Sequence, residues 1–292
     1  MNILTFDIEE WYLEKILHGG REEMYSQYNQ YLDLILDNLD ERGFKATFFC
    51  VGGMATEFPE VVKRIYDRGH EIGCHSFKHV WLNKMTEKEA FEDTRTAIDA
   101  LEQCIGKKVI SYRAPAFSIG NKNKWAMGVL MECGIKRDAS IFPAERDFGG
   151  FAQYTERVPA LVYSDKAVIK EFPISITKLM GHEIAYSGGG YFRFLPINYV
   201  RKEMGCREYN MTYFHIADLV PVMVNLKSRE EYEDYFKEPG TLKNRYMRYF
   251  KTNFGKKNAF NKFLKLIETE FFVNLEQADK MIDWQGAKSV VL

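Results

Sequence analysis

The sequence predicts an α/β fold in which parallel strands alternate with helices. Short apolar runs recur at residues 2–6, 46–51, 71–74 and 109–112 of the 292-residue chain. A segment with apolar residues at helical spacing separates each run from the next. This alternation is typical of a parallel sheet, either open or closed into a barrel. Hydrophobic residues make up 46% of the chain and charged residues 28%, which excludes collagen, coiled coil and wholesale disorder.

The helices of the first half carry signals at their ends. Gly43 follows the first apolar helical segment, and Pro59 begins the second. Thr86 and Glu89 form a capping box that begins the third, and Gly134 ends the fourth. Helices are therefore expected at residues 28–39, 59–66, 86–104 and 125–133, with a turn at residues 52–53.

The second half is less regular. Residues 168–172 and 211–214 have the composition of strands. Between them, the glycines at 188–190 indicate a turn or a close approach of two backbones. We expect the main domain to span residues 1–224.

From residue 225 onward, lysines and arginines are interleaved with aromatic residues. Phe260, Phe263, Leu264 and Ile267 recur at the spacing of an amphipathic helix. We expect residues 225–292 to form a helical appendage packed on the main domain. Its basic run is either a solvated helix face or a patch for an anionic polymer.

Charge and hydropathy exclude further classes. The net charge is −1, so no global basic field attracts nucleic acid, and no nucleic-acid partner is expected. No run of about 18 uncharged apolar residues predicts a transmembrane helix. The acidic residues at positions 7, 9 and 10 do not fit a signal peptide, and five scattered cysteines fit a reducing compartment. The expected location is the cytoplasm.

Polar residues follow several of the predicted strands. Asp7 and Glu9 end the first strand, His75 and His79 follow the third, Arg113 follows the fourth, and His215 ends the late strand. In parallel α/β folds the carboxyl ends of the strands meet at one edge, where active sites are built. The sequence therefore predicts a catalytic site at this edge.

The two histidines and one acid suggest a metal site. A spacing of four places His75 and His79 on one side of a helical turn, where both imidazoles can bind one ion. Two histidines with one carboxylate leave positions open for water, as in a catalytic zinc centre. Asp7 and Glu9 alternate with Ile8 and face the same side of an extended segment. One of them can bind the metal while the other acts as a general base.

Five segments resemble the polysaccharide deacetylase family, the NodB-type carbohydrate esterases, over about the first 220 residues. They are TFDIEEW at 5–11, HSFKH at 75–79, YRAPAFS at 112–118, DASIFP at 138–143 and YFH at 213–215. GGGYFR at 188–193 is similar to a sub-branch associated with exopolysaccharide gene clusters.

The resemblance implies a distorted (β/α) barrel, commonly of seven strands, and metal-dependent removal of acetyl groups from N-acetylated sugars. The implied partner is an acetylated glycan or its sugar precursor, and the implied cofactor is a divalent ion, with zinc expected. Glu9, His75 and His79 match the metal ligands, and Asp7 matches the catalytic base. Arg113 matches the arginine that orients the base, and His215 matches the general acid.

The chain departs from the family pattern in two places. Ile8 occupies the position where many members place a second aspartate, so Glu10 remains an alternative to Glu9 as a ligand. Relatives in the sub-branch commonly follow the late histidine with Pro-Trp-Glu, whereas this chain reads Ile216-Ala217-Asp218.

Further residues are candidates for tuning the catalytic groups or for binding the substrate. Asp138 is a candidate for tuning His215, with Asp147 as the alternative, and Glu171 is within possible reach of the site. Both Asp138 and Glu171 also fit structural ion pairs. Tyr191 is a candidate sugar-stacking surface, together with Tyr112, Phe117 and Trp125.

Three functions fit this set of residues. The first is the N-deacetylase, and the second is an amide hydrolase that opens small cyclic amides on the same scaffold. The third is a glycan-binding protein that has lost catalysis, which would have no need of Asp7, Arg113 and His215 together.

Overall fold

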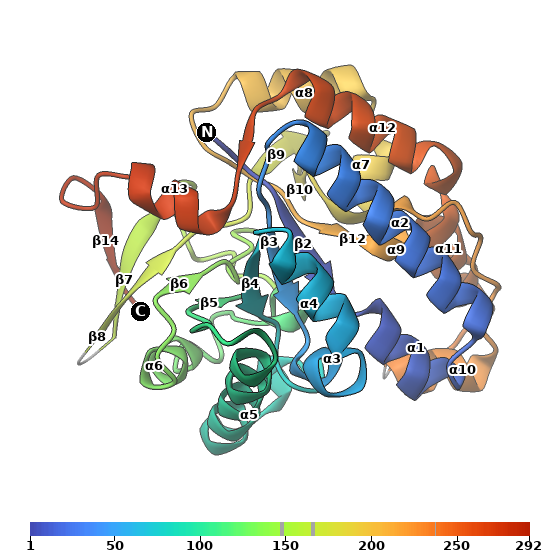
Figure 1. Cartoon of the computed structure of the whole chain (residues 1–292), viewed down its shortest axis with the longest axis horizontal. Helices are drawn as coiled ribbons and strands as arrows, with labels where there is room; N and C mark the ends of the chain where they lie inside the picture. The colour runs from blue at the N-terminus through green and yellow to red at the C-terminus, as the bar shows by residue number, and fades with distance from the viewer. Residues whose placement is uncertain (147–148, 165–166, 237) are drawn as a thin grey trace.

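Seven parallel strands form the centre of the molecule and curve into a distorted barrel, as expected (Figure 1). The computed structural model describes residues 1–146, 149–164, 167–236 and 238–292. Neighbouring strands pair in parallel throughout this set. In spatial order they are β12 (Phe214–His215), β2 (Thr5–Ile8), β3 (Thr47–Cys50), β4 (Glu71–Cys74), β5 (Ser111–Tyr112), β6 (Arg137–Asp138) and β8 (Ala167–Glu171).

The first predicted strand and the late one are each split in two. The leading parts are β1 (Asn2–Ile3) and β11 (Asn210–Met211), which pair with each other. The other side of β1 pairs with β13 (Phe272–Val273). Beyond β8 the main sheet continues through the antiparallel β7 (Ala160–Ser164) and then β14 (Lys288–Val291). A separate hairpin joins β9 (Ile176–Leu179) to β10 (His182–Ala185).

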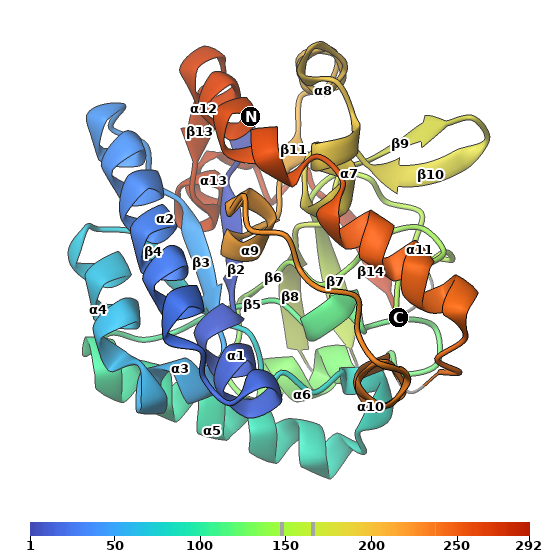
Figure 2. The same ribbon diagram turned by 90° about the vertical axis from the view of Figure 1, so that its right-hand side faces the viewer.

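Helices cover the outside of the strands (Figures 1 and 2). The expected end signals act as predicted. Pro59 lies in the first turn of α4 (Pro59–Asp67), and Gly43, just after α2 (Glu22–Glu41), has a φ of 66°. Thr86 and Glu89 form the capping box of α5 (Glu87–Ile105). The helices of the first half are α1 (Glu10–His18), α2 (Glu22–Glu41), α3 (Gly52–Glu57), α4 (Pro59–Asp67), α5 (Glu87–Ile105) and α6 (Ala126–Glu132), with short 3-10 turns at Leu82–Lys84 and Pro115–Phe117.

The expected turn at Gly52 and Gly53 is wrong, because both residues begin α3. The glycines are needed for close packing. A Cβ on Gly52 would lie 2.6 Å from the Cα of Ala97 in α5, and one on Gly53 would lie 2.3 Å from the ring of Tyr12. A spacing this short requires residues without a side chain.

The C-terminal region is not only helical. It supplies β13 and β14 in addition to α10 (Arg229–Phe236), α11 (Leu242–Asn253), α12 (Lys256–Thr269) and α13 (Leu275–Met281). Phe263 of α12 is fully buried and meets Phe6 of β2 with ring centroids 5.8 Å apart. This region therefore completes the core of the barrel. Between β10 and α10 lie α7 (Gly189–Phe194), α8 (Ile197–Gly205) and α9 (Ile216–Leu219).

One lysine of the basic run is buried and a second is half-buried. Lys256 is buried, and burial lowers its pKa to about 8. Burial also lowers the pKa of Lys262 to about 8, and its ammonium group donates to the carbonyls of Phe192 and Leu195 at the end of α7. Of the helices in the described ranges, none has the length and apolar character needed to cross a bilayer.

Candidate active site and metal centre

Neighbouring strands of the barrel bring the candidate residues to one edge. Asp7 lies in β2, and Glu9 follows at the start of α1. The parallel register of β12 places His215 opposite Asp7. His75 directly follows β4 and Arg113 directly follows β5. The predicted residues are therefore neighbours in space, although up to 208 positions separate them in sequence.

Glu9, His75 and His79 form a cluster that fits a divalent metal ion. One donor atom from each lies within 4.8 Å of the others. Oε2 of Glu9 is 2.6 Å from Nε2 of His79 and 3.5 Å from Nε2 of His75, and it is buried without a well-oriented hydrogen-bond donor. Two imidazoles and one carboxylate are the donor set of catalytic zinc and related sites.

The tautomer of His75 suits this role. Its ring is buried, and Nδ1 lies 2.7 Å from the backbone carbonyl oxygen of Arg113. A carbonyl can only accept, so Nδ1 carries the proton and donates it. Nε2 then presents its lone pair toward Glu9, an arrangement common around metal-binding histidines.

The charge state of Glu9 also fits a ligand. Burial by itself would raise the pKa of this carboxyl group. The neighbouring imidazoles of His79, His215 and His75 instead hold the pKa of Glu9 well below its usual range. A metal ligand must be deprotonated, and Glu9 meets that requirement.

The prediction that His75 and His79 share a helical turn is wrong, because residues 75–79 form an irregular loop. Ser76 and His79 have φ values of 65° and 59°, so the loop reverses its direction. The ring centroids of His75 and His79 then lie 5.2 Å apart. Ala116 and Phe117, in the other motif loop, are also left-handed. Left-handed non-glycine residues cost energy, and functional sites concentrate such strain.

Asp7 is held by a buried ion pair. Nη1 of Arg113 donates to Oδ1 of Asp7 at 2.8 Å and lies 2.7 Å from the hydroxyl of Thr5. Nε of the same arginine donates to the carbonyl of Ala139, and its guanidinium lies 4.3 Å from the ring centre of Phe49. Arg113 is fully buried. These contacts fix the orientation of the Asp7 carboxylate.

His215 lies across from Asp7 and Glu9. Its Nε2 is 3.9 Å from Oδ2 of Asp7 and 3.7 Å from Oε1 of Glu9. Burial would lower the pKa of His215, but the charges of Glu9, Asp218 and Asp7 raise it to about 10. His215 is therefore protonated near neutral pH and can donate a proton.

Asp218 orients this histidine. Its Oδ2 is 3.1 Å from Nδ1 of His215, and its Oδ1 pairs with Nη1 of Arg193. Nη2 of Arg193 donates to the carbonyl of Lys251 in α11 at 2.9 Å. Sequence reasoning noted that Asp218 keeps a carboxylate three residues after His215 but missed Arg193, although GGGYFR contains it. Although this chain lacks the Pro and Trp that commonly follow the late histidine, His215 still has a carboxylate partner, Asp218.

Asp138 and Glu171 form a buried carboxyl pair behind the site. Asp138 accepts from the hydroxyl of Ser140 at 2.6 Å, and that hydroxyl accepts from the backbone N–H of Ala114. The pair therefore supports the loop that carries Arg113. Asp138 was the candidate for tuning His215, but the carboxylate beside Nδ1 of His215 is that of Asp218. Asp147 lies outside the described residues.

Glu10 is directed away from the two histidines. Its Oε1 accepts from the backbone N–H of Ala217 at 2.8 Å, at the start of α9. Burial raises the pKa of Glu10 to about 7. Of the sugar-stacking candidates, Tyr112 and Phe117 are buried and cannot present a ring face, whereas Tyr191 is exposed.

Glu171→Gln is expected to flatten the dependence of stability on pH. Burial and the nearby charge of Asp138 raise the pKa of Glu171 well above its usual value. The folded state then holds a proton that the unfolded state releases above pH ~4.5, so the free energy of unfolding falls with rising pH, by up to about 1.4 kcal/mol per unit. Urea unfolding between pH 5 and 8 measures the slope. Glu183→Gln, at an exposed carboxyl, is the control; an unchanged slope in Glu171→Gln would contradict this assignment.

Comparison with known proteins identifies the family. Residues 3–136 match the family described as "Polysaccharide deacetylase". This stretch contains β2 through β5 and with them Asp7, Glu9, His75, His79 and Arg113. Residues 3–136 belong to the polysaccharide deacetylase family. Residues 139–280 match a second family, described as a domain of unknown function (DUF3473).

Curated relatives of this deacetylase region include two bacterial enzymes. A peptidoglycan-N-acetylglucosamine deacetylase of Bacillus cereus is 39% identical over 93 residues, which is 32% of this chain and 34% of the relative. The peptidoglycan-N-acetylmuramic acid deacetylase PdaC of Bacillus subtilis is 32% identical over 88 residues, 30% of this chain and 19% of the relative. The chain thus matches about a third or less of the length of these relatives.

A solved structure supports the fold over nearly the whole chain. The protein, from Mycobacterium smegmatis and provisionally named a polysaccharide deacetylase, superposes with a TM-score of 0.64 at 17% identity. The match covers 99% of this chain and 92% of that one. The deacetylase region and the DUF3473 region therefore occur together in one α/β fold.

Proposed function

We propose that this protein is a metal-dependent hydrolase that removes N-acetyl groups from a glycan or its sugar precursor. One observation carries the proposal. The cluster of Glu9, His75 and His79 lies beside a buried acid–base arrangement, in which Asp7 and His215 face each other at 3.9 Å. A protein that only bound glycans would not need both.

The side chains divide the work of amide hydrolysis. Asp7, fixed by Arg113, accepts the proton of the attacking water as general base. His215, fixed by Asp218, donates a proton to the departing amine, which would otherwise leave as a strongly basic anion. A divalent ion on Glu9, His75 and His79, with zinc proposed, would polarise the acetyl carbonyl and lower the pKa of water from near 16 towards about 7.

The substrate class follows from the relatives named above. Both are named for deacetylation of N-acetylated amino sugars of peptidoglycan. The shared chemistry is an acetamido group on a sugar ring. We extend that chemistry to this chain, with Tyr191 as the exposed ring available for sugar stacking.

Asp218→Asn is expected to lower kcat on the order of 10²-fold without loss of bound metal, because general acid catalysis contributes at least this much and Asp218 orients the acid. Arg193→Lys keeps the charge but lacks the two-pronged contact with Asp218 and the Lys251 carbonyl, so a smaller decrease is expected. Steady-state kinetics and metal analysis measure both. Asp283→Asn is the control, and wild-type kcat in Asp218→Asn would refute the positioning role.

The proposed activity is tested by acetate release from defined substrates. The panel consists of N-acetylglucosamine oligomers, peptidoglycan fragments and small cyclic amides, assayed before and after chelation and with zinc restored. We expect metal-dependent acetate release from the sugars and none with Asp7→Asn. Ring opening of a cyclic amide without acetate release, or glycan binding by a protein that takes up no divalent ion, would overturn the proposal.

A further inference from the structure

The solvent side of α11 carries a stripe of large apolar side chains, which we call the α11 face. Leu242 is 65% exposed, Tyr246 57% and Phe250 54%. These three residues are four apart and so lie along one side of the helix. Met247 and Phe254 adjoin the stripe, and Phe194 of α7, itself 55% exposed, extends it. Contiguous exposed apolar surface of this kind marks an interaction site.

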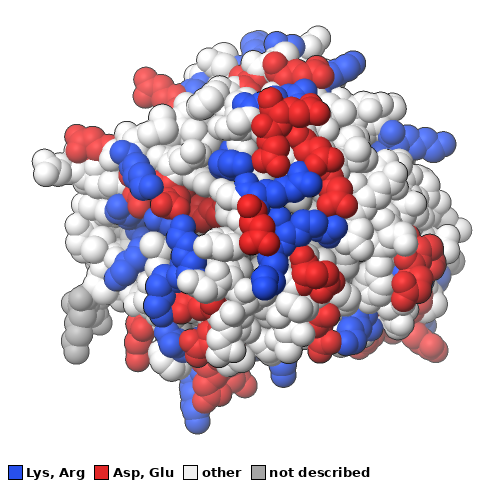
Figure 3. All heavy atoms as spheres, viewed as in Figure 1, with Lys and Arg blue, Asp and Glu red and all other residues white. Residues whose placement is uncertain are grey.

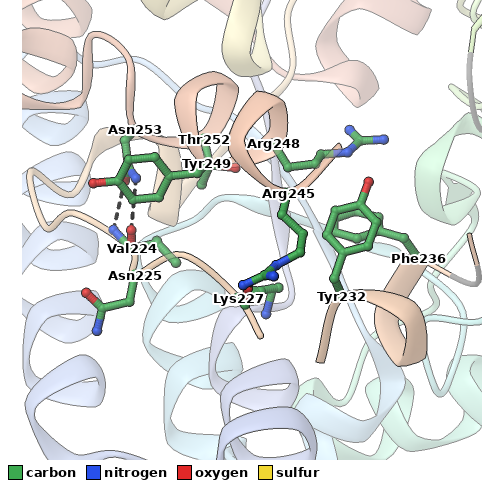
Figure 4. A pocket seen from close by; sticks show the side chains of 10 residues that line it. All are labelled: Val224, Asn225, Lys227, Tyr232, Phe236, Arg245, Arg248, Tyr249, Thr252 and Asn253. Carbon is green, nitrogen blue, oxygen red and sulfur yellow. Dashed lines mark hydrogen bonds between the residues drawn. The ribbon is translucent and has the colours of Figure 1, made fainter. Parts of the chain in front are cut away.

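The α11 face is part of the packed structure. Phe194 stacks on Phe254 with ring centroids 4.2 Å apart, and Phe254 lies 5.2 Å from Phe250. Asn253 exchanges two hydrogen bonds of 2.8 Å with the backbone of Val224 (Figure 4). These contacts hold Phe194, Phe250 and Phe254 against one another and anchor the C-terminal end of α11.

The opposite side of α11 is already occupied. Nε of Arg245 donates to the carbonyl of Lys227 at 2.7 Å, and Arg248 lies over the ring of Phe236 in α10. Figure 4 shows these side chains lining a pocket between α10 and α11. One side of α11 therefore packs against α10 and the segment before it, and the α11 face is the side that remains exposed.

The charge along α11 and most of α12 has a single sign. Residues 242–267 contain eight lysines and arginines and no acidic residue. On α11, Lys243 and Lys251 lie one turn before and one turn after Met247 and are exposed. Among the described residues, neither lysine forms an ion pair. The face seen in Figure 3 differs, because acidic and basic side chains are interleaved there. The net charge of −1 hides this local asymmetry.

We propose that the α11 face binds the surface of an anionic lipid bilayer, with α11 lying in the plane of the interface. Aromatic and aliphatic side chains flanked by lysines are the composition of interfacial helices. The lysines complement anionic headgroups, and the apolar side chains enter the boundary with the acyl chains. No spanning segment is needed for this mode of binding.

Two other occupants fit less well. A glycan needs several hydrogen-bond partners for its hydroxyls, yet Leu242, Phe250 and Phe254 offer none, and Tyr246 offers a single hydroxyl. A second copy of the chain would form a two-fold interface in which the same patch meets itself. Lys243 and Lys251 would then face the same lysines of the second copy, and the like charges would repel.

Vesicle co-sedimentation tests this inference and does not depend on an activity assay. The intact chain is mixed with vesicles of phosphatidylcholine alone or with 30% phosphatidylglycerol, at low and high salt. We expect binding to the anionic vesicles that weakens with salt. Each lysine near an anionic surface contributes about fivefold in affinity, so Lys243→Glu/Lys251→Glu should weaken binding by about 25-fold or more.

Matched variants separate the α11 face from general surface effects. Tyr246→Ser/Phe250→Ser should abolish sedimentation, while Tyr163→Ser on β7 and Lys88→Glu on α5 should sediment like wild type. Unchanged melting temperatures establish that all variants fold. Absence of vesicle binding, equal binding to neutral and anionic vesicles, or retention of binding in both α11 variants would overturn the inference. A concentration-dependent dimer that Tyr246→Ser/Phe250→Ser dissolves, without vesicle binding, would assign the face to a second copy instead.

Discussion

His75→Ala is expected to abolish stoichiometric metal binding and to lower acetate release on the order of 10³-fold or more, because the ion activates both the carbonyl and the water. His75 supplies one of three donor atoms that lie within 4.8 Å of one another. The pair that remains, Glu9 and His79, is too small a donor set for a zinc site, which usually takes three protein ligands. Metal analysis of the purified protein and acetate release measure the two effects.

The controls for this prediction separate ligand loss from misfolding. His75 is buried, so its removal also leaves a cavity, whereas His79 is half-buried and His79→Ala disturbs less packing. Both variants should lose the metal. His182→Ala, at an exposed histidine in β10, should keep it. Stoichiometric zinc in a folded His79→Ala protein would refute the ligand assignment.

Arg113→Met is expected to reduce the free energy of unfolding by about 3–5 kcal/mol and to abolish activity. The guanidinium is fully buried and donates to Asp7 at 2.8 Å. Removal of one partner leaves the other as an unpaired charge in a site with little access to water, which costs about this much. Asp7→Asn leaves the arginine unpaired in the same way. Urea unfolding of the two single variants and the double variant measures the coupling.

The double variant Asp7→Asn/Arg113→Met should cost less than the two single changes together, because no unpaired charge remains. Arg157→Met is the matched control, since its ion pair with Glu183 is about half-exposed and is worth at most about 1 kcal/mol. Strictly additive effects at Asp7 and Arg113 would contradict the buried pair.

Local signals in the sequence were enough for most of the barrel. The caps at Pro59 and Thr86 depend on residues within one turn, and the apolar runs that became β3 and β4 are buried almost throughout. Such features follow from steric and hydrogen-bond preferences of neighbouring residues. Gly52 was misread because its role depends on Ala97, which is 45 positions away.

The sequence by itself also placed Asp7, Glu9, His75, Arg113 and His215 at one edge of the sheet. This was possible because strands that run in parallel end on the same side, so a residue's position after a strand is enough to locate it. The geometry agrees with that placement, and their catalytic roles stay predictions.

Only the tertiary structure decided which side chains support these residues. It paired His215 with Asp218 and Arg193, placed Asp138 beside Glu171, and joined Arg193 to α11 through a carbonyl 58 positions away. It also showed that residues 272–273 and 288–291 are strands of the sheets. These outcomes depend on the distance and orientation of groups far apart in the chain, which neither spacing nor composition specifies.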